Sequence, residues 1–189
     1  DFGATGDGCS LDSPAIEAAI GKAVSDGWGE AVLPPGTYLC ASIDLPGNLI
    51  LHLEPGAQIL ACRDIKAYRQ HRDAFQGQAE KRACLRHYLL GAFGQKNIII
   101  RGGGSIEGSG DAFWETFCRD GTPLNDPAKP PRDSLQYRVL QPKNPRPVLL
   151  YFWECGNLQL RDFQLRNAAS YTVWMLGCEQ VKLENLNIR

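Results

Sequence analysis

The stretches that decide the fold are CGNLQLRDFQL (Cys155–Leu165) and CEQVKLENLNI (Cys178–Ile188), which repeat one apolar pattern at an offset of 23 residues. The charged residues between the apolar positions differ. A period of this length is typical of solenoids, in which each repeat stacks on the one before it. Parallel strands of successive turns lie about 4.8 Å apart, so inward residues form ladders of like side chains. We therefore predict a coiled parallel sheet with Cys178 directly over Cys155, as two buried thiols rather than a disulfide.

Most of the remaining chain consists of short runs of alternating apolar residues, separated by Gly, Asn and Pro. Strands of about four to six residues with such punctuation are typical of all-β proteins. Asn48, Asn97 and Asn157 each precede an alternating run, which extends the repeated motif toward the start of the chain. No Asn-Gly or Asp-Gly turn joins two neighbouring runs, so simple antiparallel meanders are disfavoured.

One helix is predicted near the start of the chain. Ser13 is expected to cap it, Pro14 suits its first turn, and Gly27 is expected to end it. The opening at Asp1 fits a trimmed or mature terminus, and no signal peptide is recognised.

Composition and charge exclude several classes of function. The chain has 20 basic and 21 acidic residues, without the cationic excess of a general nucleic-acid binder. No apolar run approaches the roughly 18 residues that a membrane helix needs. Seven cysteines leave at least one unpaired within the chain, and none belongs to a C-x-x-C motif. His52, His71 and His87 are not at zinc-site spacings relative to them, so no metal site is expected.

Two segments interrupt the strand pattern. Residues 63–90 hold seven Lys or Arg against three Asp or Glu, interleaved with aromatic residues. Residues 110–147 include a Pro-rich, locally basic part from residue 119 onward. Insertions in a solenoid bulge from one face and often build its binding surface. These two segments could gather cations beside a cleft for an anionic polymer, although solvated loop charge is an equally good interpretation of any single residue.

A set of ordered segments carries a family resemblance. They read DFGATGDG, AIEAAI, AVLPPGTYL, LHLEPGAQIL, NIIIRGGGSIEGSGDAFW and RPVLLYFWECGNLQLRDFQLRNAASYTVWMLGCEQVKLENLNI. In this order they resemble the N-terminal half of the polygalacturonases, glycoside hydrolase family 28. The resemblance covers nearly the whole chain apart from the two insertions.

The resemblance implies a right-handed, single-stranded parallel β-helix, with the first helix capping its N-terminal end. Residues 1–189 would be the N-terminal part of one such domain, truncated at its C-terminal end. The implied activity is cofactor-free hydrolysis of pectic or related uronic-acid polysaccharide. The implied setting is cell-wall carbohydrate metabolism by a secreted or periplasmic protein, with no nucleic-acid or membrane partner.

The family inverts the anomeric centre with two carboxyl groups, about 6.5–9.5 Å apart to admit a water molecule. Its catalytic residues come from an N-T-D-G-I-D segment, a following Asp pair, a G-H-G turn and an R-x-K strand. All of these lie downstream of the segment that matches 183–189, and none occurs in this chain. We therefore expect no catalytic residue here. The chain's own carboxylates are not marked by an apolar setting that would raise a pKa: Asp111, Glu115, Asp162, Glu179 and Glu184.

Substrate contacts are predicted beside the missing catalytic strand, which would stack on residues 171–174. Val173 should point inward there, whereas Tyr171 and Trp174 should point outward, where aromatic rings suit sugar faces. The family often has Trp and His at the latter two positions, and this departure leaves the substrate class open. Arg132, Arg138 and Arg146 could pair with uronate carboxylates, of which Arg138 and Arg146 are the chosen candidates. For the aromatic residues Tyr171 and Trp174, packing under a loop is the competing interpretation.

Two other functions remain open. One is a non-catalytic carbohydrate-binding β-helix of the tailspike or adhesin type. The other is a pectate-lyase-like enzyme or an epimerase on the same fold, using calcium and a basic residue.

Overall fold

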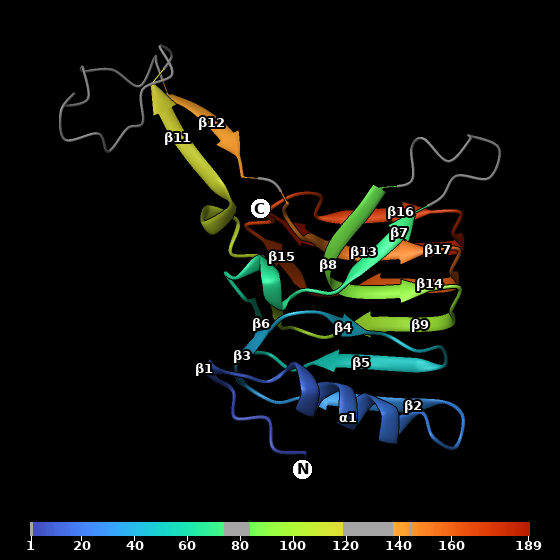
Figure 1. Cartoon of the computed structure of the whole chain (residues 1–189). Helices are drawn as coiled ribbons and strands as arrows, with labels where there is room; N and C mark the ends of the chain where they lie inside the picture. Colours follow the sequence, from blue (N-terminus) through green and yellow to red (C-terminus); the bar gives the residue numbers. More distant parts are fainter. Residues whose placement is uncertain (1, 74–83, 119–137, 144) are drawn as a thin grey trace.

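The computed structural model describes residues 2–73, 84–118, 138–143 and 145–189, with the backbone alone at residues 73, 84, 115–118 and 138–142. The strands stack in successive turns of a coil, as Figure 1 shows, and α1 (Ser13–Ala23) covers the first turn. The inside is filled by one continuous apolar core, to which α1 contributes Ile16 and Ile20. The predicted parallel β-helix with a capping helix is confirmed.

Three parallel sheets form the sides of the described coil. Sheet 1 contains β2 (Gly29–Leu33), β5 (Leu49–Leu53), β9 (Lys96–Arg101), β14 (Gly156–Arg161) and β17 (Glu179–Glu184). Sheet 2 contains β1 (Asp7–Leu11), β3 (Gly36–Cys40), β6 (Ala57–Ala61), β10 (Ser105–Glu107), β15 (Gln164–Arg166) and β18 (Asn187–Ile188). Sheet 3 contains β4 (Ile43–Asp44), β8 (Cys84–Phe93), β13 (Val148–Trp153) and β16 (Val173–Leu176). From β2 onward each turn passes through sheet 1, then sheet 2, then sheet 3.

The strand register produces the predicted ladders of inward side chains. Sheet 1 stacks Ala31, Leu51, Ile100, Leu160 and Leu183 in one column. Sheet 2 stacks Tyr38, Ile59, Ile106, Leu165 and Ile188. The buried side chains of these columns belong to the core. They stabilise the coil because removing apolar area from water is the main favourable term in folding.

The repeat that opened the sequence lies in register. Gly156 pairs with Glu179, and the Glu179 amide donates to the Cys155 carbonyl at 2.9 Å. Cys178 therefore lies over Cys155 in the next turn, as predicted, and both are free thiols.

Asparagines lie at the corner where the chain enters sheet 1. Asn48, Asn97 and Asn157 all have positive φ, a left-handed conformation that asparagine tolerates better than most residues. The Asn97 side-chain amide donates to Asn48 Oδ1 at 2.7 Å, and that of Asn157 donates to Asn97 Oδ1 at 2.9 Å. Stacked amides thus link successive turns at this corner.

The helix differs from its prediction at both ends. Its N-cap is Asp12, and Ser13 accepts a hydrogen bond at Oγ from the Ala41 amide at 2.8 Å, so its hydroxyl joins the helix to the coil. The helix ends at Ala23, before the predicted Gly27; the Val24 amide donates to the Ile20 carbonyl at 3.1 Å and the Ser25 amide to the Lys22 carbonyl at 3.4 Å.

Antiparallel pairing, which the sequence disfavoured, occurs in the segments of the two insertions. In 63–90, a 3₁₀ turn η1 (Ile65–Ala67) leads to β7 (Gln70–Asp73), which pairs antiparallel with the first half of β8. In 110–147, a second 3₁₀ turn (Gly110–Phe113) leads to β11 (Trp114–Cys118), which pairs antiparallel with β12 (Arg138–Pro142). In Figure 1 the β11–β12 pair projects from the stack, whereas β7 lies beside the strands of sheet 3.

Candidate functional site

The outer side of sheet 3 carries a second apolar cluster, separate from the core inside the coil. Leu90 and Leu150 belong to the core inside the coil, as do Leu89 and Leu149 before them. Tyr151, which follows Leu150, belongs to the outer cluster instead, as alternation along a strand predicts. The outward set packs together and is called the outer aromatic face: Tyr88, Phe93, Tyr151, Trp153 and Trp174.

A glycine makes room for this packing. In the outward column of sheet 3, Gly91 lies between Asp44 and Tyr151. A Cβ atom at Gly91 would lie 2.5 Å from Cδ2 of Tyr88 and 2.8 Å from Cζ of Phe93. The two rings therefore fill the space that a side chain at Gly91 would occupy.

The β7–β8 hairpin adds a histidine to the outer aromatic face. The His71 ring stacks on Phe93 with centroids 3.7 Å apart and planes inclined by 11°. It meets Tyr151 edge-on at 5.7 Å and Trp153 at 5.8 Å. Such geometries are favourable for aromatic groups, so the hairpin is held against the sheet beyond its own ladder.

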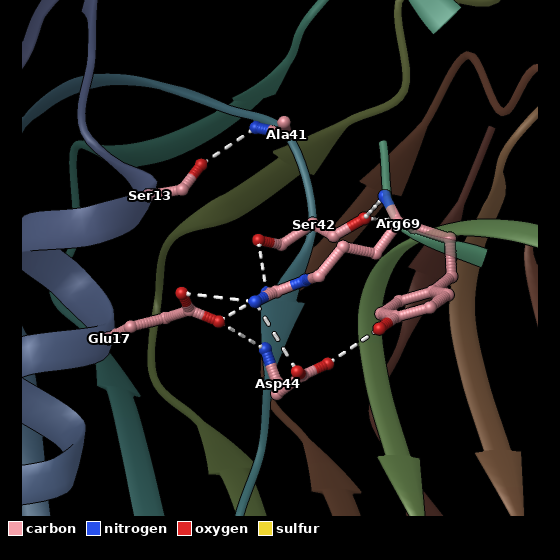
Figure 2. Close-up of polar contacts among 7 residues, drawn as sticks. Ser13, Glu17, Ala41, Ser42, Asp44 and Arg69 are labelled. Carbon is pink, nitrogen blue, oxygen red and sulfur yellow. Dashed lines mark hydrogen bonds and ion pairs between the residues drawn. The ribbon is translucent and has the colours of Figure 1, made fainter. Parts of the chain in front are cut away.

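An arginine joins this hairpin to the capping helix. Figure 2 shows Glu17 of α1 and Asp44 of β4 on either side of the Arg69 guanidinium, which forms ion pairs with both. Arg69 also donates to the Ser42 carbonyl at 2.7 Å, and its amide donates to Ser42 Oγ at 2.8 Å. The hydroxyl of Ser42 in turn donates to the Tyr88 carbonyl at 2.6 Å. Three segments far apart in sequence are thereby fixed at the base of the hairpin.

The Tyr88 hydroxyl connects this polar cluster to the outer aromatic face. It donates to Asp44 Oδ1 at 2.7 Å. Burial, reinforced by the Asp44 carboxylate, raises the pKa of Tyr88. The phenol therefore stays protonated and remains a donor near neutral pH.

Of the predicted contact residues, Tyr171 and Trp174 lie together at one edge of sheet 3. Their ring centroids are 4.3 Å apart, and Tyr171 is 49% exposed. Val173 packs against the inner core and Trp174 against the outer aromatic face, in the directions expected from the repeat. The Arg86 guanidinium lies 4.4 Å from the Trp174 ring centroid. Trp174 thus packs partly beneath the hairpin, whereas Tyr171 reaches solvent.

The predicted arginines lie elsewhere. Arg146, just before β13, has its guanidinium 4.5 Å from the Trp114 ring centroid and donates to the Ala169 carbonyl at 3.1 Å. The Trp114 indole donates to the same carbonyl at 2.9 Å. Arg138 begins β12 opposite Cys118, and its side chain is outside the described part of the structure. Arg132 and much of the two basic segments also fall outside the described residues.

Three of the five carboxylates that were considered as catalysts are held in local contacts. Asp111 pairs with Arg63 at 2.6 Å, and this hydrogen bond lowers the pKa of the Asp111 carboxyl. Asp162 accepts from the Asn185 amide at 3.0 Å, and Glu184 pairs with Lys182 at 2.9 Å. Glu179 is an exposed residue of β17, and Glu115 lies in β11, with its side chain outside the description.

Neither a metal-ligand cluster nor a membrane-spanning helix occurs in the described part of the chain. It contains no group of three or more His, Cys, Asp or Glu side chains placed to hold a metal ion. None of its helices has the length and apolar character required to cross a membrane.

Sequence reasoning missed most of the outer aromatic face. The segment LRHYLLGAF (85–93) and the segment VLLYFW (148–153) are apolar on both sides of the strand, so alternation alone does not separate inside from outside. A strand buried on both faces reads as a continuous apolar run. That pattern was the available signal that something covers sheet 3 from outside.

The fold and the outer aromatic face define a parallel β-helix with an aromatic outer side on sheet 3. No family model matches the chain. It is similar to Polygalacturonase-2 of Solanum lycopersicum, with 27% identity over 192 residues that cover 99% of this chain and 35% of the relative. The chain spans only about 35% of the length of the first relatives that it matches.

A solved structure agrees on the fold. The exopolygalacturonase of Thermotoga maritima superposes with a TM-score of 0.76, covering 100% of this chain and 45% of that one at 23% identity. The chain therefore has the right-handed parallel β-helix fold and resembles a polygalacturonase of glycoside hydrolase family 28 over about a third of such a protein's length.

A shorter match points to another enzyme class. The mannuronan C5-epimerase AlgE1 of Azotobacter vinelandii is 46% identical over 59 residues, which cover 31% of this chain and 4% of the epimerase.

Proposed function

We propose that this chain is the N-terminal part of a glycoside hydrolase that cleaves pectic or related uronic-acid polysaccharide. The observation that carries the proposal is the end-to-end similarity to polygalacturonases, on a coil of the same fold. Because its substrate would be an extracellular polymer such as pectin in the cell wall, the protein would be secreted or periplasmic.

In this proposal the outward side of sheet 3, at Tyr171 and Trp174, contacts the sugar chain. Tyr171 offers a half-exposed ring tilted by 58° against Trp174, with Arg86 beside the latter. Sugar faces pack on aromatic rings, and a cation beside them would pair with a uronate carboxylate. Arg146 and Arg138 would contact the polymer from the segments before β13.

The reaction would follow the inverting mechanism. One carboxylic acid protonates the leaving oxygen while a second carboxylate activates a water molecule on the opposite face of the sugar, at a separation of about 6.5–9.5 Å. Since Asp111, Asp162 and Glu184 are held in local contacts and the family's catalytic motifs do not occur in this chain, we assign these two groups to residues outside the 189 present. They would belong to a strand stacked on β16, beside Tyr171 and Trp174. The residues present here would bind and orient the polymer.

The test is release of reducing ends from polygalacturonate, measured for the 189-residue chain and for the whole protein that contains it. We expect release by the whole protein and none by the chain. Release by the chain would overturn the assignment of the carboxylates. An inactive whole protein would overturn the proposed hydrolase activity.

Binding can be tested separately by titrating the chain with oligogalacturonates. We expect Tyr171→Ala to weaken binding about tenfold, equivalent to about 1.4 kcal/mol, and Arg146→Lys to weaken it less. Trp28→Ala is the matched control, because Trp28 is also about half exposed but lies at the α1 end of the coil. Equal effects at Tyr171 and Trp28 would exclude sheet 3 as the binding edge.

A uronate epimerase is the second candidate, favoured by the 46% identity over 59 residues. Such an enzyme would change the configuration of a uronic-acid polymer without breaking it. Proton exchange at C5 of the polymer in deuterated water, with no new reducing ends, would support the epimerase and contradict the hydrolase.

A further inference from the structure

Two cysteines are stacked on successive turns of the coil. Cys155 and Cys178 occupy the same corner of successive turns, between the end of a sheet 3 strand and the start of a sheet 1 strand. Their neighbours Gly156 and Glu179 are in register, and the Glu179 amide bonds to the Cys155 carbonyl at 2.9 Å. Stacked residues of adjacent strands are about 4.8 Å apart, within the roughly 4.4–6.8 Å between Cα atoms that a disulfide spans.

The sulfur atoms lie in equivalent places. Cys155 Sγ is 3.3 Å from the carbonyls of Ala92, one turn below, and Trp153, in its own turn. Cys178 Sγ is 3.6 Å from the Phe152 carbonyl one turn below and 3.7 Å from that of Leu176. Each thiol therefore reaches a carbonyl of the turn below it, so Cys178 Sγ projects toward the turn that carries Cys155.

The two thiols differ in access and acidity. Cys155 is 2% exposed, whereas Cys178 is only partly buried. A hydrogen bond from the Cys155 thiol to the Cys178 sulfur lowers the pKa of Cys178, and the same interaction raises the pKa of Cys155. The accessible member is thus the one that forms a thiolate more easily, and the thiolate is the reactive form.

We propose that Cys155 and Cys178 form a reversible disulfide that joins two successive turns of the coil, with a small-molecule disulfide as the oxidant. The proposal is independent of the polysaccharide hydrolase. It assigns Cys178 as the attacking thiol and Cys155 as the resolving thiol.

The chemistry balances as two thiol–disulfide exchanges. The Cys178 thiolate attacks one sulfur of the oxidant, forms a mixed disulfide and releases one small thiolate. That thiolate takes the proton of Cys155, whose sulfur then attacks Cys178 Sγ and expels the second small thiolate, which is protonated by water. Two protein thiols are oxidised and one disulfide molecule is reduced to two thiols.

The test uses the intact chain exposed to graded ratios of oxidised to reduced glutathione, followed by alkylation and tryptic peptide mapping. Cleavage after Lys143, Arg161, Arg166 and Lys182 places the two cysteines in separate peptides, 144–161 and 167–182. We expect these peptides to become linked, with a loss of about 2 Da, and to separate again on reduction. Independent alkylation of both, at a ratio that already modifies the exposed Cys9, would overturn the proposal.

Variants test the order of attack. Cys155→Ser should trap glutathione on Cys178 as a stable mixed disulfide, whereas Cys178→Ser should leave Cys155 unmodified because it is buried. Cys9→Ser is the matched control and should leave the link intact. The opposite pattern, with glutathione trapped on Cys155, would contradict the assigned roles. A link that forms equally well in urea-unfolded chain would show that stacking does not direct it.

Discussion

Two turns of the coil carry the same apolar pattern in opposite surroundings. Leu160 and Leu165 of the earlier turn are fully buried, whereas Leu183 and Ile188, which stack on them, are 52% and 56% exposed. In a solenoid each repeat contacts only its neighbours, so the burial of a residue depends on whether a turn lies on both sides of it. The comparison teaches that the same sequence pattern contributes unequal stability at different heights of the stack.

The largest expected effect is at the stacked leucines. Leu160→Ala should lower the free energy of unfolding by about 3 kcal/mol, because it leaves a cavity between two turns. In the same 189-residue chain, Leu183→Ala is the matched control and should cost about 0.5 kcal/mol or less, because Leu183 is exposed there. Urea denaturation followed by tryptophan fluorescence measures both. Equal losses would show that height in the stack does not decide the cost.

Substituting a glycine tests the packing in the opposite way, because it adds a side chain instead of removing one. Gly91→Ala should lower the free energy of unfolding by about 2 kcal/mol, because its Cβ would meet two packed rings. The Tyr88 ring has little room to move, since its hydroxyl is bonded to Asp44.

Gly21→Ala is the control for that change. Gly21 lies in α1 with nothing within 4 Å of its added Cβ, so the substitution should stabilise the chain by up to about 1 kcal/mol. The same urea titration measures it. A stabilising Gly91→Ala would mean that the outer aromatic face is not packed as described.

Asparagines test the corners of the same two regions. Asn97→Ala removes an amide bonded to the turns below and above, and should cost about 2 kcal/mol. Asn185 shares its positive φ but bonds only to Asp162 at an exposed corner, so Asn185→Ala should cost about 1 kcal/mol. Thermal unfolding of the two variants gives the difference. A larger loss of stability for Asn185→Ala than for Asn97→Ala would show that the stacked amides do not stabilise the coil.

The smallest effect concerns the other end of the stack. Asp7 accepts hydrogen bonds from the Ser10 and Cys9 amides at 2.7 and 2.8 Å, which lower its pKa from 3.8 to about 2. Because the folded-state pKa is depressed, this contribution to stability is complete above pH 4 and disappears as the pH falls toward 2.

Carbon-13 NMR titration of the Asp7 carboxyl measures this directly. Ser10→Ala removes one hydroxyl donor, 2.8 Å from Asp7 Oδ2, and should raise the pKa while leaving the two amide donors in place. A wild-type Asp7 that titrates near 3.8 would contradict the described turn. These bonds reach only two and three residues along the chain, so they do not depend on stacking.

The sequence predicted the coil well because its periodicity is local and is repeated. The register of the stacked asparagines, Asn48, Asn97 and Asn157, could be predicted from the repeat alone. The same holds for the stacking of Cys178 on Cys155. The start of the helix was less predictable. Ser13 resembles a cap, but its hydroxyl bonds to Ala41 from another turn, a competing tertiary contact that no local pattern records.

The candidate site was predicted only in part. The directions of Val173 and Trp174 followed from alternation on one strand. The placement of His71 on Phe93 and of Arg86 on Trp174 did not, because both depend on a hairpin that folds back over sheet 3. The roles of Tyr171, Trp174, Arg138 and Arg146 in binding stay predictions.

Both hairpins leave the coil at the same corner, between a sheet 2 strand and the following sheet 3 strand. Equivalent asparagines are therefore 49 and 60 residues apart in sequence, yet their amides still meet at 2.7 and 2.9 Å. The number of residues inserted at this corner therefore does not change the spacing between successive turns. A foreign domain whose two ends lie close together could be spliced in there, and its fusion would carry a new specificity without re-engineering the scaffold.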